Sequence, residues 1–266
     1  MAEKIVWVAA YPKTGSTWLR SILQQVLAPR MRAKDAIVSF DKDYPVDAPE
    51  HHVMSTNAKV LRTHTHPQHK VFQTLQEQWP HRPVGVITIQ RHPLDVLLSQ
   101  INYAFILGRE ASFKDGLVKR AEDIIADGEI DHYIDAFIES DGCPEYAKRC
   151  RSYGGFYDAW RQLASGTEHL HLRYETMVEE REAAIERVAR YLRLDGVDAH
   201  LIMCRVEERT KADGRFYWRK RRYGFRDLLP ASSVRRFEQG FAATLRQLGY
   251  SLHAYILIPI VLANPF

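Results

Sequence analysis

The sequence predicts an α/β fold: a single domain in which helices flank a central, mostly parallel sheet. Short β-branched runs alternate with segments of helical apolar spacing, an order typical of parallel sheets. One of these runs, residues 84–90, is apolar and β-branched, as strands covered on both faces are. The chain has 266 residues, 45% of them hydrophobic, and can therefore bury one large core.

The first half of the chain is expected to contain three strands and two helices. Residues 4–11 form a short buried strand, and residues 14–27 form a helix with its apolar side chains on one side. Residues 60–63 and 84–90 are two further strands, and residues 95–105 form the helix that follows. A strand, a tight turn and a helix thus occur twice.

The second half begins with an irregular segment. Residues 109–147 have a mostly helical pattern that Gly128, Gly142 and Pro144 interrupt, so this segment is expected to be an insertion. The pattern then predicts a helix over residues 157–164, a strand over 169–174, and a charged helix over 176–192 closed by Asp195-Gly196.

Charge and cysteine content exclude several classes of protein. Lys and Arg number 37 against 33 Asp and Glu, an excess that favours an anionic ligand only weakly. Cys143, Cys150 and Cys204 show neither CxxC nor Cys/His spacing, so neither a disulfide framework nor a zinc site is expected, and a reducing cytoplasm fits. The N-terminus lacks the pattern of a secretory signal.

Residues 254–266 form an apolar tail that differs sharply from the amphipathic helix before it. Its apolar run falls well short of the ~20 residues that a membrane-spanning helix needs, so no membrane span is predicted. A docked C-terminal segment, an oligomer contact and a stretch foreign to the natural protein all fit this composition. The predicted domain therefore covers residues 1–253, and the sequence leaves a homodimer open.

A first candidate phosphate site lies where the first strand gives way to the first helix, in the segment YPKTGSTW of residues 11–18. Free backbone N–H groups and the helix dipole favour an anion there. Gly15 lets the turn close, and Lys13 can reach a bridging oxygen. The lysine precedes the glycine, unlike in GxxxxGK[ST], and no strand ends in the Asp expected to hold magnesium, which counts against an ATP-driven kinase.

This segment closely resembles the 5′-phosphosulfate loop of sulfotransferases that use 3′-phosphoadenosine 5′-phosphosulfate (PAPS), whose pattern is close to YPKSGTTW. The resemblance implies the sulfotransferase fold with its P-loop-like nucleotide-binding core. It also implies PAPS as cofactor, adenosine 3′,5′-bisphosphate (PAP) as product, and no metal. Trp18 would stack on the adenine, although a tryptophan here is otherwise most simply a core residue. The 5′-phosphosulfate would be held by Lys13, Thr14, Gly15, Ser16 and Thr17.

A second candidate phosphate site follows the strand that ends at residue 90. In the segment RHPLDVLLS of residues 91–99, Arg91 stands at a strand's carboxyl end and Ser99 about two helical turns later. Sulfotransferases have RNPxDxxxS here, the 3′-phosphate loop, and His92 replaces the asparagine. The resemblance implies that Arg91 and Ser99 bind the 3′-phosphate, for which the planar guanidinium is well suited. Asp95 is expected to cap a helix or pair with a cation.

A third basic segment, FYWRKRRYGFR, spans residues 216–226. Such a cluster on its own fits a nucleic-acid or polyanion surface as well as a nucleotide site. It resembles the family's late RKGxxGDW loop, which implies that Arg219, Lys220 and Arg221 bind the 3′-phosphate. Arg221 replaces the family's first glycine. Arginine, unlike glycine, cannot adopt unusual backbone dihedral angles at little cost, so the local turn is expected to differ. Tyr174, in a segment that resembles the family's RYEDL, would lie near the adenine.

The catalytic base is expected to be a histidine. Sulfuryl transfer needs in-line attack by an acceptor oxygen, whose proton a group of near-neutral pKa can take. Residues 62–67, RTHTHP, resemble the family's KTHLP segment, in which the histidine is the base; the aligned residue is His64, and His66 is the alternative. Lys13 would support the bridging oxygen, and Ser99 would link cofactor binding to the position of that lysine.

The sequence therefore predicts a sulfotransferase that moves the sulfuryl group of PAPS to a hydroxyl of a small acceptor, such as a phenol or alcohol, by direct transfer. The insertion of residues 109–147 is expected to shape the acceptor pocket. Neither nucleic acid nor a membrane is an expected partner. A phosphotransferase of related fold and a polyanion-binding module are the rival functions, distinguished by magnesium-dependent ATP binding and by steep salt dependence respectively.

Overall fold

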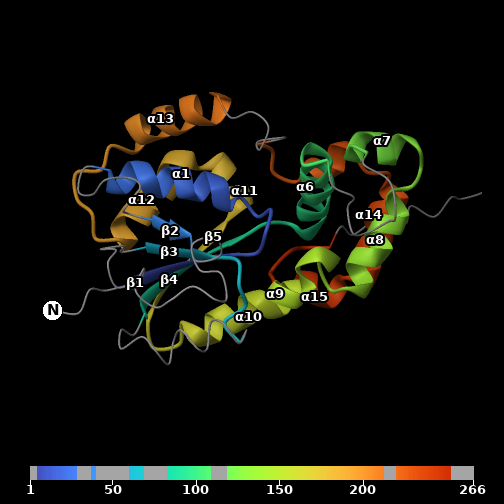
Figure 1. Cartoon of the computed structure of the whole chain (residues 1–266), viewed down its shortest axis with the longest axis horizontal. Helices are drawn as coiled ribbons and strands as arrows, with labels where there is room; N and C mark the ends of the chain where they lie inside the picture. Colours follow the sequence, from blue (N-terminus) through green and yellow to red (C-terminus); the bar gives the residue numbers. More distant parts are fainter. Residues whose placement is uncertain are drawn as a thin grey trace, which may run out of the picture.

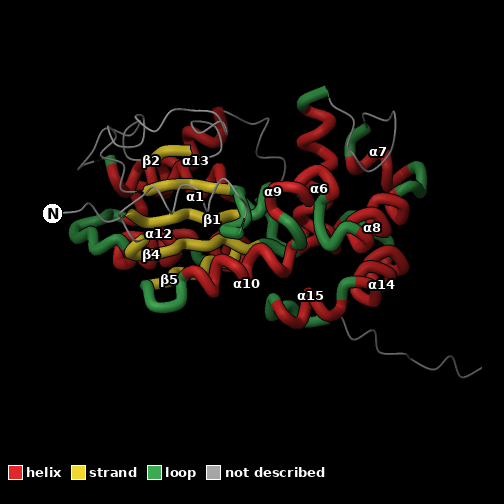
Figure 2. Tube along the Cα trace, turned by 60° about the horizontal axis from the view of Figure 1, so that its bottom comes forward, coloured by secondary structure: helices red, strands yellow, loops and turns green. Residues whose placement is uncertain are grey.

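The computed structural model describes residues 5–28, 37–39, 60–68, 83–108, 119–212 and 220–252. Within these residues the α/β fold is confirmed. One five-stranded sheet has the order β2-β3-β1-β4-β5, and every recorded pairing in it is parallel. Figure 2 shows the strands side by side in the sheet. In chain order they are β1 (Ile5–Ala10), β2 (Ile37–Ser39), β3 (Val60–Thr63), β4 (Pro83–Gln90) and β5 (Glu168–Arg173).

Helices cover both faces of the sheet (Figure 1). Successive side chains of a strand point to opposite faces, so β1 contributes to two separate cores. Trp7 packs with Trp160 on one face, at a ring-centroid distance of 6.0 Å, whereas Val8 belongs to the core on the other face. The first face carries α10 (Tyr153–Leu163), and the second carries α1 (Ser16–Leu27), α12 (Arg181–Tyr191) and α13 (Ala199–Ala212).

A helical lobe lies beyond the carboxyl ends of the strands, at the right of Figure 1. Its core is aromatic, and Phe137 contacts both Phe237 and Phe241 at centroid distances of 5.9 and 5.5 Å. These aromatic side chains belong to the same core as Trp7 and Trp160, so the lobe is packed continuously with one face of the sheet. The helices of this part are α6 (Pro93–Ile106), α7 (Ala121–Ala126), α8 (Ile130–Glu139), η1 (Pro144–Tyr146), α9 (Ala147–Cys150), η3 (Gly224–Asp227), α14 (Ala231–Gly240) and α15 (Ala242–Gln247).

One expected helix is wrong in its extent. The charged segment 176–192 was expected to be continuous, but the structure has α11 (Tyr174–Glu179) and α12, separated at Glu180, whose dihedral angles (φ −113°, ψ 56°) are not helical. The chain leaves α12 before Asp195-Gly196. Arg193 takes the left-handed conformation (φ 56°), and the N–H of Leu194 donates to the Ala189 carbonyl at 2.9 Å, which is the Schellman pattern without its usual glycine.

None of the described helices is both long enough and apolar enough to cross a membrane. The apolar tail of residues 254–266 lies outside the described residues, as does Arg219.

Two histidines of β5 make the stability of this fold depend on pH. His169 Nε2 and His171 Nδ1 both lie 2.9 Å from the Thr88 hydroxyl oxygen on β4. Burial, and then the nearby His169 and Arg173, lower the pKa of His171 from 6.5 to about 4. The unfolded chain therefore binds a proton between these pH values that the folded chain does not.

We expect the free energy of unfolding to fall by on the order of 2 kcal/mol as the pH drops from about 6.5 to about 4, because His171 then charges only on unfolding. Urea titrations at several pH values measure this slope. His171→Asn retains a hydrogen-bonding group near Nδ1 but does not titrate, so its slope should be shallower. An identical slope in the variant would mean that other groups cause the acid sensitivity.

Candidate active site

The predicted site segments follow four neighbouring strands. His64 comes directly after β3, residues 11–15 follow β1, Arg91 follows β4, and Tyr174 follows β5. Since these strands are parallel and adjacent, their carboxyl ends meet at one edge of the sheet. In open α/β sheets, ligands bind outside the carboxyl ends of the strands, at the point where the strand order reverses. In this sheet that point lies at β1, which has β3 on one side and β4 on the other. The topology therefore gathers segments that are far apart in the sequence.

The loop between β1 and α1 has a tightly specified backbone. Thr14 donates from its buried hydroxyl to the Tyr11 carbonyl at 2.7 Å. Gly15 has φ 100°, and a Cβ on it would lie only 2.6 Å from Cδ2 of Tyr174, so both the dihedral angle and the space require glycine. Lys13 also has a positive φ, 69°, which costs energy for a residue with a side chain and is common at functional sites.

Two cations lie close together above this loop. Arg91 is 6% exposed, and its Nη1 donates to the Lys13 carbonyl at 3.3 Å. Burial first, and then the charge of Arg91, lower the pKa of Lys13 to about 7. The Lys13 side chain lies over the ring of Tyr103, with Nζ 3.5 Å from the centroid. A negatively charged ligand in this place would therefore stabilise the charged forms of both side chains.

Arg91 is only partly neutralised within the protein. Its Nε lies 4.0 Å from Asp95 Oδ2 and has no hydrogen-bond partner among the described residues. Burial raises the pKa of Asp95, and the charge of Arg91 acts in the opposite direction. The guanidinium lies over the ring of Tyr174, with its Cζ 4.2 Å from the centroid. Ser99, one of the predicted partners of Arg91, is half-buried on α6.

Trp18 and Tyr174 pack edge to face, with ring centroids 6.0 Å apart. Both are nearly buried, and the indole N–H of Trp18 has no hydrogen-bond partner among the described residues. Gly15 lies against the same tyrosine. Trp18 thus belongs to the core under α1 and also lies next to the first phosphate loop, residues 11–15.

His92, which replaces the asparagine of the family pattern, has a clear local role. Its Nδ1 accepts from the N–H of Leu94 and caps α6, and its ring stacks on Phe225 at a centroid distance of 4.4 Å. Its own backbone N–H donates to Glu175 at 2.7 Å. Asp95 of α6 accepts from the N–H of Phe225 at 2.9 Å, so hydrogen bonds join the start of α6 to α11 and to η3.

The structure separates the two candidate bases by tautomer. His64 Nδ1 lies 2.6 Å from the Ala10 carbonyl oxygen, which can only accept, so Nδ1 carries the proton and Nε2 the lone pair. His66 is 3% exposed, and its Nδ1 accepts from the N–H of Gln68, so in the neutral ring Nε2 carries the proton. His64 is half-buried. In the neutral ring of His64, the nitrogen that can accept a proton is therefore Nε2.

The comparisons with known proteins bear directly on these loops. A family model described as the sulfotransferase domain matches residues 3–213, which include all of these loops except the segment that begins at Lys220. The chain belongs to the sulfotransferase family. No curated protein sequence matches it well enough to be counted as a relative.

Solved structures similar to this sulfotransferase share its fold at low sequence identity. The mouse sulfotransferase SULT7A1 complexed with PAP has a TM-score of 0.58 and 15% identity, with 92% of this chain and 86% of that chain covered. Retinol dehydratase in complex with androsterone and the inactive cofactor PAP has a TM-score of 0.55 and 14% identity, with coverages of 92% and 82%. Retinol dehydratase with retinol and PAP has a TM-score of 0.56 and 14% identity, with the same coverages.

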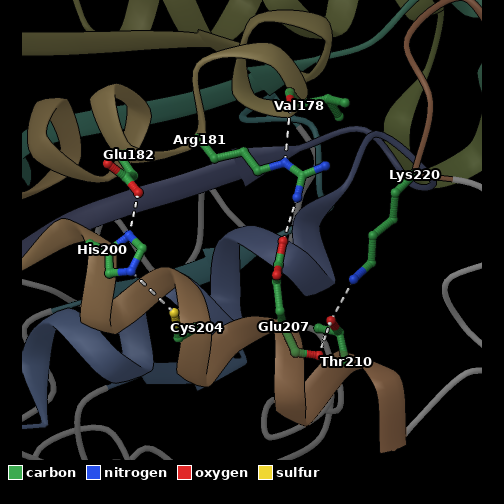
Figure 3. A network of polar contacts seen from close by, with 8 residues as sticks. All are labelled: Val178, Arg181, Glu182, His200, Cys204, Glu207, Thr210 and Lys220. Atoms are coloured by element: carbon green, nitrogen blue, oxygen red, sulfur yellow. Dashed lines mark hydrogen bonds and ion pairs between the residues drawn. The ribbon is translucent and has the colours of Figure 1, made fainter.

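Lys220, the first described residue of the late basic segment of the sulfotransferase, reaches Thr210 of α13 with its side chain (Figure 3). Lys220 Nζ donates to the Thr210 hydroxyl at 2.5 Å, and that hydroxyl donates to the Glu207 carbonyl at 3.1 Å. The Glu207 carboxylate pairs with Arg181 of α12. Burial lowers the pKa of Lys220.

Arg221 is exposed and pairs with Asp227 at 3.0 Å. The left-handed residue of its loop is Tyr223 (φ 48°), so the arginine in place of the family's first glycine does not have to adopt a glycine conformation.

Two residues of the site have no place in the sequence prediction. Tyr103 carries the Lys13 ammonium on its ring, and Glu175 accepts from His92 while its other oxygen accepts from Tyr250 at 3.4 Å. Tyr103 could have been found from its spacing, one helical turn after Ser99 on the same face of α6. Glu175 could have been found as the neighbour of Tyr174 in a recognised segment.

Proposed function

We propose that this sulfotransferase transfers the sulfuryl group of PAPS to a hydroxyl of a small-molecule acceptor by direct in-line transfer. The observation that carries the proposal is the close pair of Lys13 and Arg91 at the carboxyl ends of β1 and β4. Arginine can bind the 3′-phosphate with two parallel donors, and a helix N-terminus favours the 5′-phosphosulfate. A nucleotide with phosphates at both positions would supply the negative charge that both cations lack.

The residues have distinct roles in this proposal. His64 takes the proton of the acceptor hydroxyl at Nε2 as the oxygen attacks sulfur, and Lys13 stabilises the oxygen of the 5′-phosphate that leaves as the S–O bond breaks. Arg91 and Ser99 hold the 3′-phosphate, and Trp18 and Tyr174 lie near the adenine. The nearby amides of the loop, from residues 14–17, bind the 5′ group. Lys220, Arg221 and Arg219 belong to the same phosphate site.

A small acceptor is supported by the solved structures of similar fold, whose complexes contain androsterone or retinol. The segment of residues 109–147 would shape the acceptor pocket. Its described part reaches the first phosphate loop, where the N–H of Cys143 donates to the Tyr11 hydroxyl at 2.9 Å. The cysteines are free thiols, which suits a reducing cytoplasm.

Calorimetry with PAP and ADP, each with and without magnesium, tests the nucleotide. We expect metal-independent binding that favours PAP, and a loss of about tenfold or more in PAP affinity in Arg91→Ala, since each 1.4 kcal/mol of lost contact costs tenfold. Arg193→Ala, which removes an exposed arginine paired with Glu168, is the matched control and should bind like the wild type.

Magnesium-dependent binding of ADP equal to that of PAP would overturn this proposal in favour of a phosphotransferase. Binding of long polyanions with a steep salt dependence, and no preference for PAP, would instead support the polyanion-binding function.

A further inference from the structure

Tyr103 occupies a particular place between the two phosphate loops. It lies on α6 four residues after Ser99, so the two side chains share one face of the helix. The Lys13 ammonium, from the other loop, lies 3.5 Å above the centre of the Tyr103 ring. The ring thus links the end of the 3′-phosphate segment to the lysine of the 5′-phosphate segment.

The ring is the one described group that favours a charge on Lys13 at neutral pH. Arg91, at the end of β4, opposes that charge by repulsion, and burial opposes it by desolvation. Cys143, which follows α8, acts in the other direction only as a thiolate, but burial raises the pKa of its thiol far above the usual value and keeps it neutral. Among the described residues, no hydrogen-bond acceptor or carboxylate pairs with Lys13 Nζ.

The face of an aromatic ring attracts a cation because its quadrupole is negative there, and the attraction grows when water is excluded. Lys13 is half-buried, and the distance of 3.5 Å is well within the range of about 6 Å over which such contacts act. A side chain of similar size without a π face would leave the ammonium buried beside Arg91 with nothing to compensate its charge.

We propose that Tyr103 is a positioning residue for Lys13, whose ring face holds the ammonium between the two phosphate loops and keeps it in the charged form. The inference rests on the proposed function for its consequence, because a charged Lys13 is what the 5′-phosphosulfate and the leaving oxygen require. Its first step, the effect of the ring on the lysine, does not depend on any substrate.

The test compares wild type, Tyr103→Phe and Tyr103→Leu. Competitive acetylation across the neutral and alkaline range, with the peptide containing Lys13 quantified by mass spectrometry, gives the pKa of this amine. We expect Tyr103→Phe to match the wild type, since it keeps the ring face. Tyr103→Leu should lower the Lys13 pKa by about 0.5 to 1.5 units, the range that a contact of this kind produces.

Binding of PAP provides a second measurement. Above the Lys13 pKa, Tyr103→Leu should bind PAP about 3- to 30-fold more weakly than wild type, which is the same pKa shift expressed as a loss of the protonated form. The two affinities should converge as the pH falls, because Lys13 is then charged in both proteins. A merely structural role for Tyr103 would weaken binding equally at every pH. Should Tyr103→Leu fail to fold, Tyr103→Met serves as the second variant without a ring.

The outcomes separate the two proposals. Absence of PAP binding in the wild type would overturn the proposed function, and the acetylation experiment would still decide the role of Tyr103. Normal PAP binding together with an unchanged Lys13 pKa in the ring-free variant would overturn the inference on Tyr103 and leave the sulfotransferase proposal intact.

Discussion

Replacing His64 by asparagine is expected to lower kcat by about 10²- to 10⁴-fold, the usual loss when a general base is removed. Asparagine can keep the hydrogen bond from the Nδ1 position to the Ala10 carbonyl, so the loop after β3 should retain its conformation. The change removes the part of the ring that contains Nε2 and its lone pair. Transfer of labelled sulfate from PAPS to a panel of phenols and alcohols measures the loss, and PAP affinity should be unchanged.

The matched control is His66→Asn, which keeps an oxygen that can accept from the N–H of Gln68. This variant should retain most of its turnover, because His66 is buried and its Nδ1 is already used. If His66→Asn loses turnover and His64→Asn keeps it, the assignment of the base is reversed. The comparison thus settles a choice that the sequence leaves open.

The sequence predicts the sheet well because its strands are short apolar runs with clear ends. The strand over residues 60–63 has the bounds of β3, and that over 84–90 differs from β4 by one residue. Strand β2 was not predicted, since three residues are too few for a pattern. The break at Glu180 was also missed, because a charged residue between two helical turns has no sequence signal, and only packing against the sheet decides where α11 ends.

The site is predictable where one motif contains both the backbone turn and the ligand-binding side chain. The loop of residues 11–15 is such a case, since Gly15 is required by its own φ and by the nearness of Tyr174. The contact of Lys13 with Tyr103 is different, because it joins residues ninety positions apart in the sequence. No sequence motif contains both residues, so only the fold shows that they meet. The same holds for Lys220, whose partner Thr210 lies on a helix that the sequence analysis did not single out.

Replacement within a motif is better understood from the structure than from the pattern. His92 stands where the family has asparagine. Its Nδ1 nevertheless accepts the same kind of capping bond from Leu94 that an asparagine oxygen would accept. The larger ring also packs on Phe225, so the substitution adds a contact between α6 and the loop that contains Arg221.

Lys13→Met is expected to reduce kcat by about 10²- to 10³-fold, comparable to the loss of a single donor to a developing negative charge. The same change should stabilise the protein. The pKa of Lys13 is about 7 in the folded state and near 10.5 when unfolded, so at neutral pH the folded chain binds this proton less readily than the unfolded chain. Methionine removes that cost while filling a similar volume.

The gain in the free energy of unfolding should reach up to about 4 kcal/mol at pH 7. It should vanish as the pH rises toward 10.5, because the unfolded chain then also loses this proton and the cost of burying the lysine disappears. Urea titrations at several pH values measure the gain, with the exposed Lys148→Met as control. A variant that loses turnover without becoming more stable would show that Lys13 is not held as a costly buried amine. A gain in stability together with a loss of turnover in Lys13→Met would mean that this sulfotransferase keeps a destabilising residue because the transferred group requires it.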